Sequence, residues 1–153
     1  MVRSNPSGDS GGGGTRVPCV LLVDDSEDDV DLALMALRTL PQRPEVRVAR
    51  DGVEALELMR SGDPKPGLVL LDLNMPRLDG AGVLRERRQD GALRKIPVVV
   101  FSTSAADWDV DQSYDLGANG YMVKPLEVDR LDAMLGDLLR VFFEHLRTPP
   151  SLR

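Results

Sequence analysis

Three short runs of consecutive apolar residues, each followed at once by a polar side chain, constrain the fold of this chain more than any other feature. The runs occupy residues 19–23, 68–71 and 98–101. An unbroken apolar run of this length is typical of a central strand in a parallel sheet, because helices cover such a strand on both faces. The sequence therefore predicts a layered α/β fold with these strands at its centre.

Amphipathic segments alternate with the apolar runs and complete the pattern. Five segments have the apolar spacing of helices, and they lie after Ser26, at 53–60, at 80–89, after Asp107 and at 127–146. Ser26 and Asp107 are expected to cap their helices, and Gly117 suits the end of the fourth. Shorter strands are expected at 46–49, as an edge strand, and at 120–123. Because parallel strands need crossover helices, the sequence predicts five right-handed βα units that form a doubly wound parallel sheet.

The two ends of the chain differ in composition from its middle. Residues 1–16 are rich in Gly and Ser and have almost no apolar side chains. Such a segment cannot offset its ordering entropy, so we expect a disordered tail. The folded domain is expected to span 17–148, with a short C-terminal tail at 149–153.

Charge and hydropathy exclude several classes of partner. The chain carries a formal net charge of −6 without a local run of Lys or Arg, whereas nucleic-acid binding needs a basic face. No stretch approaches the ~18 apolar residues of a membrane span, and the first residues lack the apolar segment of a signal peptide. We therefore expect a cytoplasmic protein with neither nucleic acid nor membrane as a partner.

The polar residues at the strand ends form a second informative pattern. Asp24 and Asp25 follow the first apolar run, and Asp72 follows the next. Ser102 ends the third run, and Lys124 follows the fifth strand. Ligands of an open parallel sheet bind just beyond the carboxyl ends of its strands. Side chains far apart in the sequence are therefore expected to converge in one pocket.

Three carboxylates in one pocket need compensating charge. At an effective dielectric constant of about 20, two like charges about 4 Å apart repel by about 4 kcal/mol. A hard divalent cation relieves this repulsion, and Mg²⁺ prefers the carboxylate, carbonyl and water oxygens available here. With Lys124 and Ser102 nearby, the pocket predicts phosphoryl transfer to Asp72. The alternative is that the acids only cap helices and solvate a sheet edge, which suits Asp25 or Ser26 alone better than the whole set.

Four motifs, in this order, resemble the receiver domains of two-component response regulators. They read LLVDDSEDD, LLDLNMPRLDG, VVVFSTS and GANGYMVKP, and the resemblance covers residues 20–146. It implies a flavodoxin-like sheet of parallel strands in the order 2-1-3-4-5. It also implies a phospho-accepting switch rather than an enzyme, with self-phosphorylation from a donor and autodephosphorylation as its only chemistry.

The resemblance also implies a role for each polar residue of the pocket. Asp72 matches the phosphoacceptor, and Mg²⁺ would be held by Asp24, Asp25, Asp72 and the backbone carbonyl of Asn74. The positions that bind the phosphoryl group or switch on its arrival match Ser102, Thr103, Tyr121 and Lys124. Many receivers have threonine where this chain has Ser102, but the hydroxyl is kept.

Two further expectations come from the same resemblance. The peptide bond between Lys124 and Pro125 is expected to be cis. The side chains of Asn74 and Ser104 flank the pocket and are expected to tune dephosphorylation.

A narrower resemblance concerns the phosphodonor. The segments SEDDVDLALMAL, VARDGVEALELM and FFEHLRTPP are similar to the small receivers that partner bacterial phytochromes and related sensor histidine kinases. This similarity implies that a histidine kinase donates the phosphoryl group, with a bacteriophytochrome as one candidate.

The last helix carries more apolar surface than one face needs. One stripe, expected to cover the sheet, consists of Val128, Leu131, Leu135, Leu138, Phe142 and Leu146. Four further apolar side chains lie partly outside it, namely Met134, Leu139, Val141 and Phe143. Two interpretations stay open. The surplus forms a homodimer or kinase contact with the strand at 120–123 and the helix after Asp107, or the C-terminal extension folds back and buries it.

Two other functions stay open at this point. A Mg²⁺-dependent phosphatase or phosphotransferase could use Asp72 as its nucleophile. Aspartate-nucleophile phosphatases resemble this arrangement, but they carry a second acid two positions later, where this chain has Asn74. The other alternative is a receiver-like adaptor that is never phosphorylated. Such adaptors usually lack part of the acidic set that is complete here.

Overall fold

The computed structural model describes residues 17–147 and 149. The expected tail at 1–16 and most of the expected tail at 149–153 lie outside the described residues. The strands are β1 (Cys19–Val23), β2 (Glu45–Ala49), β3 (Leu68–Leu71), β4 (Val98–Ser102) and β5 (Gly120–Val123). The α-helices are α2 (Glu27–Arg38), α3 (Gly52–Ser61), α4 (Gly80–Gln89), α5 (Asp107–Asp115) and α6 (Val128–Arg140). Two short turns complete the set, a 3-10 helix η2 (Leu93–Lys95) and a π-helical turn η3 (Val141–His145).

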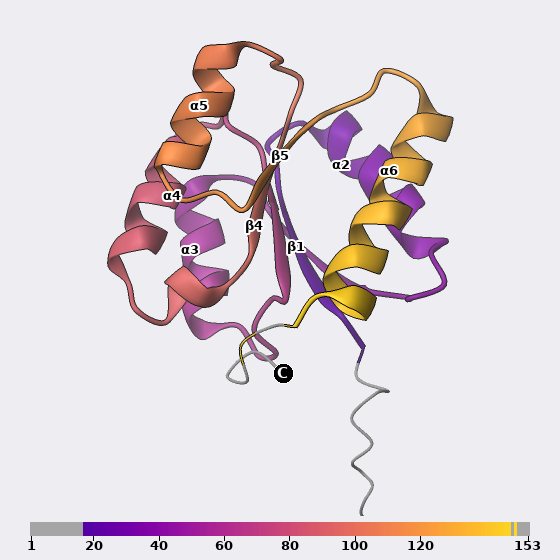
Figure 1. Cartoon of the computed structure of the whole chain (residues 1–153), viewed down its shortest axis with the longest axis horizontal. Helices are drawn as coiled ribbons and strands as arrows, with labels where there is room; N and C mark the ends of the chain where they lie inside the picture. The colour runs from indigo at the N-terminus through magenta and orange to yellow at the C-terminus, as the bar shows by residue number, and fades with distance from the viewer. Residues whose placement is uncertain (1–16, 148, 150–153) are drawn as a thin grey trace, which may run out of the picture.

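All strands run parallel in one sheet of order β2-β1-β3-β4-β5, which confirms the predicted fold class. Helices α2 and α6 cover one face of the sheet, and α3, α4 and α5 cover the other (Figure 1). Alternate residues of a strand point to opposite faces. In β1, Leu21 and Val23 therefore join the core under α3 and α4, while Val20 and Leu22 join the core under α2 and α6.

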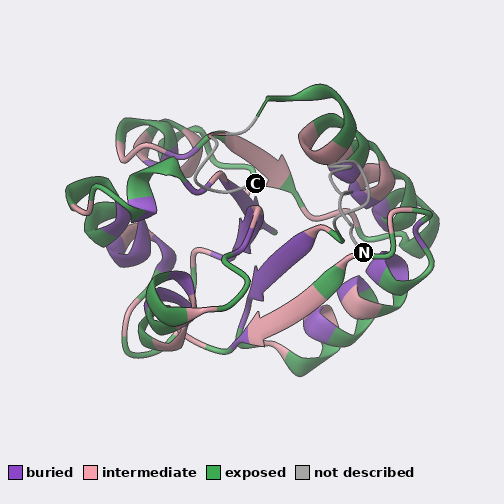
Figure 2. Ribbon diagram, turned by 90° about the horizontal axis from the view of Figure 1, so that it is seen from below, coloured by how far each residue is buried: buried purple, intermediate pink, exposed green. Residues whose placement is uncertain are grey.

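The central strands are buried along their whole length, as their unbroken apolar sequences predict. Every residue of β1, β3 and β4 is buried, whereas in β2 only Ala49 is. Figure 2 shows this contrast between fully buried and partly buried strands. The predicted edge position of β2 is thus confirmed. No helix in the described part of the chain has both the length and the hydropathy that a bilayer crossing requires.

The helix ends show one correct and one wrong capping prediction. The Ser26 hydroxyl accepts the Asp29 backbone N–H at 3.3 Å and caps α2, as expected. Asp107 is not a cap, because it is already the first residue of α5 and Ala106 precedes it as the N-cap. The loop gets its polar contacts from Ser104 instead, whose hydroxyl accepts the Ala106 N–H. Gly117 has a φ of 99°, the left-handed conformation expected just beyond a helix end.

The last helix differs from the single helix expected over 127–146. Helix α6 ends at Arg140, and the chain continues in the wider π-helical turn. The predicted stripe is wrong at both ends, since Val128 is 50% exposed and Leu146 is 51% exposed. Leu139, expected to lie partly outside the stripe, is fully buried. The π-helical turn shifts the later side chains around the axis, so that Phe142 and Phe143 pack against the core.

Candidate metal centre

The carboxyl ends of the strands bring the expected polar residues to one edge of the sheet, the upper edge in Figure 1. Backbone hydrogen bonds continue the strand pairing beyond the strand ends and fix the first residue after each. The Asp72 N–H donates to the Val23 carbonyl at 2.9 Å. The Lys124 N–H donates to the Ser102 carbonyl at 2.8 Å. The convergence therefore follows from the parallel register of the sheet.

Three carboxylates meet at this edge. One oxygen each of Asp24, Asp25 and Asp72 lies within 4.8 Å of the others. Asp24 is 3% exposed and Asp72 is 9% exposed, while Asp25 faces solvent. A set of hard oxygen donors with one side open to water suits a cation such as Mg²⁺ or Mn²⁺, which keeps several water ligands. These residues could hold a divalent metal ion, and that ion would offset their repulsion.

Burial sets the protonation of Asp72. Removal from water raises the pKa of this carboxyl from 3.8 to about 6, against the opposing charge of Lys124. The charges of Asp24 and Asp25 raise it further, and the Leu73 N–H, which donates to Asp72 Oδ1 at 2.9 Å, lowers it. With a pKa of about 6, the carboxylate is mostly ionised at neutral pH. A cation at this point would favour the ionised, nucleophilic form.

Lys124 forms ion pairs with two acids, neither of which is Asp72. Its ammonium Nζ lies 2.6 Å from Asp24 Oδ2 and 3.0 Å from Asp29 Oδ2, and no ion pair joins it to Asp72 in the described residues. Burial alone would lower the pKa of Lys124, but hydrogen bonds to these two carboxylates raise it above its ordinary value. Asp29 was not identified from the sequence as a partner of Lys124. Its one signal there is a place among the acids of the first turn of α2.

The loop after β4 links the buried hydroxyl to the aromatic residue of β5. Ser102 is fully buried, and its hydroxyl oxygen accepts the Ser104 N–H at 3.1 Å. The Tyr121 hydroxyl donates to the Ser104 carbonyl at 2.8 Å. The Ser104 hydroxyl in turn donates to Asp109 Oδ2 on α5 at 2.5 Å. A shift of Ser102 would therefore change the contacts of Tyr121 and of α5.

The loop after β3 is anchored by residues that sequence reasoning missed. Arg77 has a φ of 65° and pairs with Asp51, with Nη2 lying 2.7 Å from Asp51 Oδ2. The Gly80 N–H donates to the Leu73 carbonyl at 3.0 Å. A Cβ at Gly80 would lie 2.5 Å from the Asp72 carbonyl oxygen, so only glycine permits this approach. These contacts fix the segment that carries Asn74.

Asn74 and Thr103 are exposed residues, and the roles expected of them stay predictions. The prediction of a cis bond between Lys124 and Pro125 is wrong, because the one cis peptide bond among the described residues is Asp63–Pro64. A trans bond is the intrinsically favoured form, and from it Lys124 already reaches its two carboxylate partners.

The chain matches a family model and a curated relative over most of its length. The model of the response regulator receiver domain matches residues 20–136. The response regulator Rcp1 of Synechocystis sp. is 36% identical over 137 residues, which cover 86% of this chain and 93% of Rcp1. The residues matched by the family model include the acidic cluster, Lys124 and all strand residues except Cys19.

Solved structures of response regulators have the same fold as this chain. The phosphorylated cyanobacterial phytochrome response regulator RcpA superposes with a TM-score of 0.81 at 34% identity, covering 88% of this chain and 99% of RcpA. The Mn²⁺-bound form of Rcp1 superposes with a TM-score of 0.77 at 36% identity, covering 86% of this chain and 99% of that one. The chain therefore belongs to the family of response regulator receiver domains of two-component systems, and it is related to phytochrome response regulators.

Proposed function

We propose that this protein is a single-domain response regulator that receives a phosphoryl group on Asp72 from a sensor histidine kinase, with Mg²⁺ as cofactor. The observation that carries the proposal is the cluster of Asp24, Asp25 and Asp72, whose carboxylate oxygens lie within 4.8 Å of one another. A relative of this chain has been solved with Mn²⁺ bound, and Mn²⁺ and Mg²⁺ share a preference for oxygen ligands.

A hydrogen bond to one oxygen of Asp72 supports its role as acceptor. Asp72 Oδ1 accepts the Leu73 N–H, which leaves the other oxygen to form the new bond to phosphorus. As that P–O bond forms, the P–N bond of the donor phosphohistidine breaks, and the imidazole leaves. A bound Mg²⁺ would neutralise charge on the transferring group. Lys124 supplies a second positive charge and Ser102 a hydroxyl donor, and both reach the edge of the sheet where Asp72 lies.

The signal would leave the site through β5 and its neighbours. Ser102 and Tyr121 both contact Ser104, so a phosphoryl group that draws the Ser102 hydroxyl would shift the start of α5. A ligand moves such an equilibrium only through its differential contacts with the two states. The proposed switch therefore requires that Ser102 and Lys124 bind the phosphoryl group more strongly in the active state than in the resting state.

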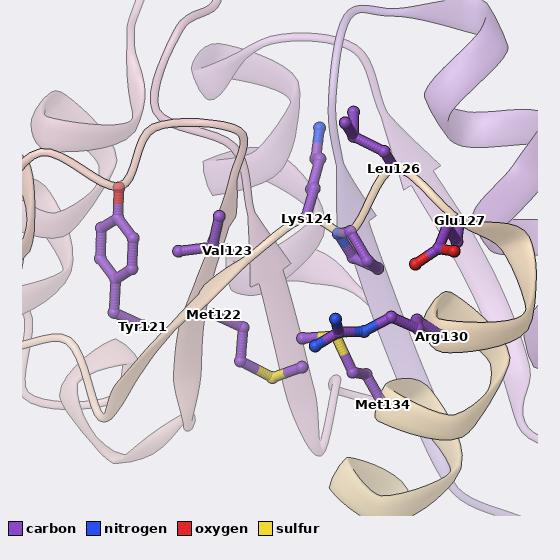
Figure 3. Close-up of a pocket in the computed structure, with 9 residues that line it drawn as sticks. Tyr121, Met122, Val123, Lys124, Leu126, Glu127, Arg130 and Met134 are labelled. Carbon is purple, nitrogen blue, oxygen red and sulfur yellow. The ribbon is translucent and has the colours of Figure 1, made fainter.

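The face formed by α5, β5 and α6 has exposed apolar side chains. A cavity of ≈ 580 Å³ beside β5 is lined by residues of β5, of the following loop and of α6, including Leu126 and Met134 (Figure 3). Leu126 is 99% exposed and Trp108, at the start of α5, is 71% exposed. We propose that this face, made of α5, β5 and α6, binds a protein partner and forms a homodimer. Light scattering tests the dimer, and a monomer both with and without a phosphoryl analogue would contradict it.

The family supports a proposal for the partner and for the location. Receiver domains act with histidine kinases, and the relative RcpA is a phytochrome response regulator. We propose a sensor histidine kinase as donor, with a bacteriophytochrome as the first candidate, and a cytoplasmic site of action. The net charge of −6 makes a protein rather than a nucleic acid the expected target.

A phosphate-affinity gel tests the function. The wild type, Asp72→Asn and the matched control Asp28→Asn are incubated with acetyl phosphate and Mg²⁺, and a second wild-type sample contains EDTA. We expect a retarded band for the wild type and the Asp28→Asn control only. A folded wild type without a retarded band would contradict the proposal and favour the adaptor alternative. Retardation that survives EDTA would contradict the metal requirement.

A further inference from the structure

The ammonium group of Lys124 is shared between two acids of different elements. Asp24, at the end of β1, lies 2.6 Å from it, and Asp29, in the first turn of α2, lies 3.0 Å from it. The Ser26 hydroxyl accepts the Asp29 backbone N–H and so fixes the turn that carries Asp29. The same cap residue donates its own N–H to Asp24 Oδ1 at 2.9 Å. Both carboxylates are thus held in place before any phosphoryl group arrives.

The two acids differ in how well water could replace Lys124. The Asp24 side chain is 4% exposed, so water could hardly replace the ammonium beside it if the ammonium moved away. The Asp29 side chain is 39% exposed, and water can solvate it. When a group in the site draws Lys124 toward Asp72, the contact with Asp29 is therefore the one that breaks. Asp29 competes with the incoming group for the same ammonium.

We propose that Asp29 is a positioning residue that holds Lys124 in the resting state and must release it when Asp72 is phosphorylated. This inference rests on the proposed function and adds a residue outside the acidic cluster to it. Asp29 lowers the stability of the phosphorylated state relative to the resting state, because part of the Lys124 contact energy is already used. The switch is consequently harder to turn on than the cluster and Lys124 alone would make it.

The test measures binding of beryllofluoride, a phosphoryl analogue, at saturating Mg²⁺. Asp29→Asn keeps the size of the side chain and the helix cap, but its amide holds the ammonium less strongly than a carboxylate. We expect it to bind beryllofluoride about fivefold more tightly than the wild type, the ratio that corresponds to one partly exposed ion pair. Asp28→Asn is the matched control, because it removes the same charge from the same helical turn at an exposed residue that does not contact Lys124. We expect it to change the affinity by less than about twofold.

Two further measurements separate positioning from a general charge effect. In a Lys124→Met background, Asp29→Asn should no longer change beryllofluoride affinity, because the contested group is gone. Without any analogue, the ¹⁵N resonance of the Lys124 ammonium should shift in Asp29→Asn and stay unchanged in Asp28→Asn.

The outcomes distinguish this inference from the proposed function. If the wild type binds beryllofluoride but Asp29→Asn behaves like Asp28→Asn, Asp29 does not compete for Lys124 and the inference alone is overturned. Loss of affinity in Asp29→Asn would also overturn it. If no variant binds the analogue although the ammonium resonance shifts in Asp29→Asn, the proposed function falls, and the competition falls with it.

Discussion

The carboxylate of Asp72 should destabilise the metal-free protein at neutral pH, and replacing it with an amide should reveal this. Burial raises the pKa of Asp72 from 3.8 to about 6. A difference of about two pKa units corresponds to about 3 kcal/mol at roughly 1.4 kcal/mol per unit. The pKa of about 6 already includes the opposing charge of Lys124, and partial access of water reduces the effect, so we expect Asp72→Asn to gain roughly 1–3 kcal/mol of unfolding free energy at pH 7.

The gain should depend on pH in a defined direction. Below about pH 4 the carboxyl is protonated in both the folded and the unfolded chain, so the substitution changes little. Between about pH 4 and 6 the folded chain keeps a proton that the unfolded chain releases, and wild-type stability falls as pH rises. Above about pH 6 the difference is complete. The amide oxygen of the variant can still accept the Leu73 N–H, so that contact is not lost.

Urea unfolding in EDTA, followed by circular dichroism from pH 4 to 8, measures this effect. The control is Asp31→Asn, an exposed acid on α2 outside the cluster, which should show no such pH-dependent gain. Adding Mg²⁺ should stabilise the wild type and close the gap to Asp72→Asn. A stability difference that is constant across this pH range, or a variant less stable than the wild type at pH 7, would refute the electrostatic reasoning.

Two more predictions concern packing away from the site. A Cβ at Gly67 would lie 2.9 Å from the Phe143 ring, so Gly67→Ala should displace the C-terminal turn. We expect this variant to lose about 1–3 kcal/mol of unfolding free energy, measured with urea. Gly91 has open space around it, so the control Gly91→Ala should change that free energy by less than about 0.5 kcal/mol. Equal effects would show that the turn is not packed there. Arg87 is 4% exposed and donates to three backbone carbonyls and one side-chain amide, so Arg87→Met should lower stability by about 2–4 kcal/mol. The control is Arg88→Met, because Arg88 is exposed and donates to one backbone carbonyl only. If both variants lost the same unfolding free energy, the buried hydrogen bonds of Arg87 would not explain its effect.

The strands and their polar ends could be predicted because the signal is local. An unbroken apolar run such as 68–71 allows few structures other than a central strand, and the parallel sheet then places Asp72 beside Asp24. Helix α4 was predicted with its observed bounds, since the glycine and polar residues at its ends are also local signals.

The errors lie where distant contacts decide the outcome. The predicted apolar stripe of the last helix is too long. The spacing of its apolar residues does not reveal the π-helical turn, through which Phe143 packs over Gly67. The contact between Lys124 and Asp29 spans 95 positions, and no spacing rule connects them. The expected cis bond at Pro125 came from a resemblance, and the trans form found here already satisfies the Lys124 side chain.

The measurement that tests the central claim most directly is the identity of the phosphorylated residue. The protein is phosphorylated with acetyl phosphate and Mg²⁺, reduced with borohydride, which converts an aspartyl phosphate to homoserine, and sequenced by tandem mass spectrometry. We predict homoserine at the position of Asp72 and at no other aspartate in the described residues. Homoserine at Asp24 or Asp25, or unmodified peptides throughout a folded sample, would contradict the assignment of Asp72 as the phosphoacceptor.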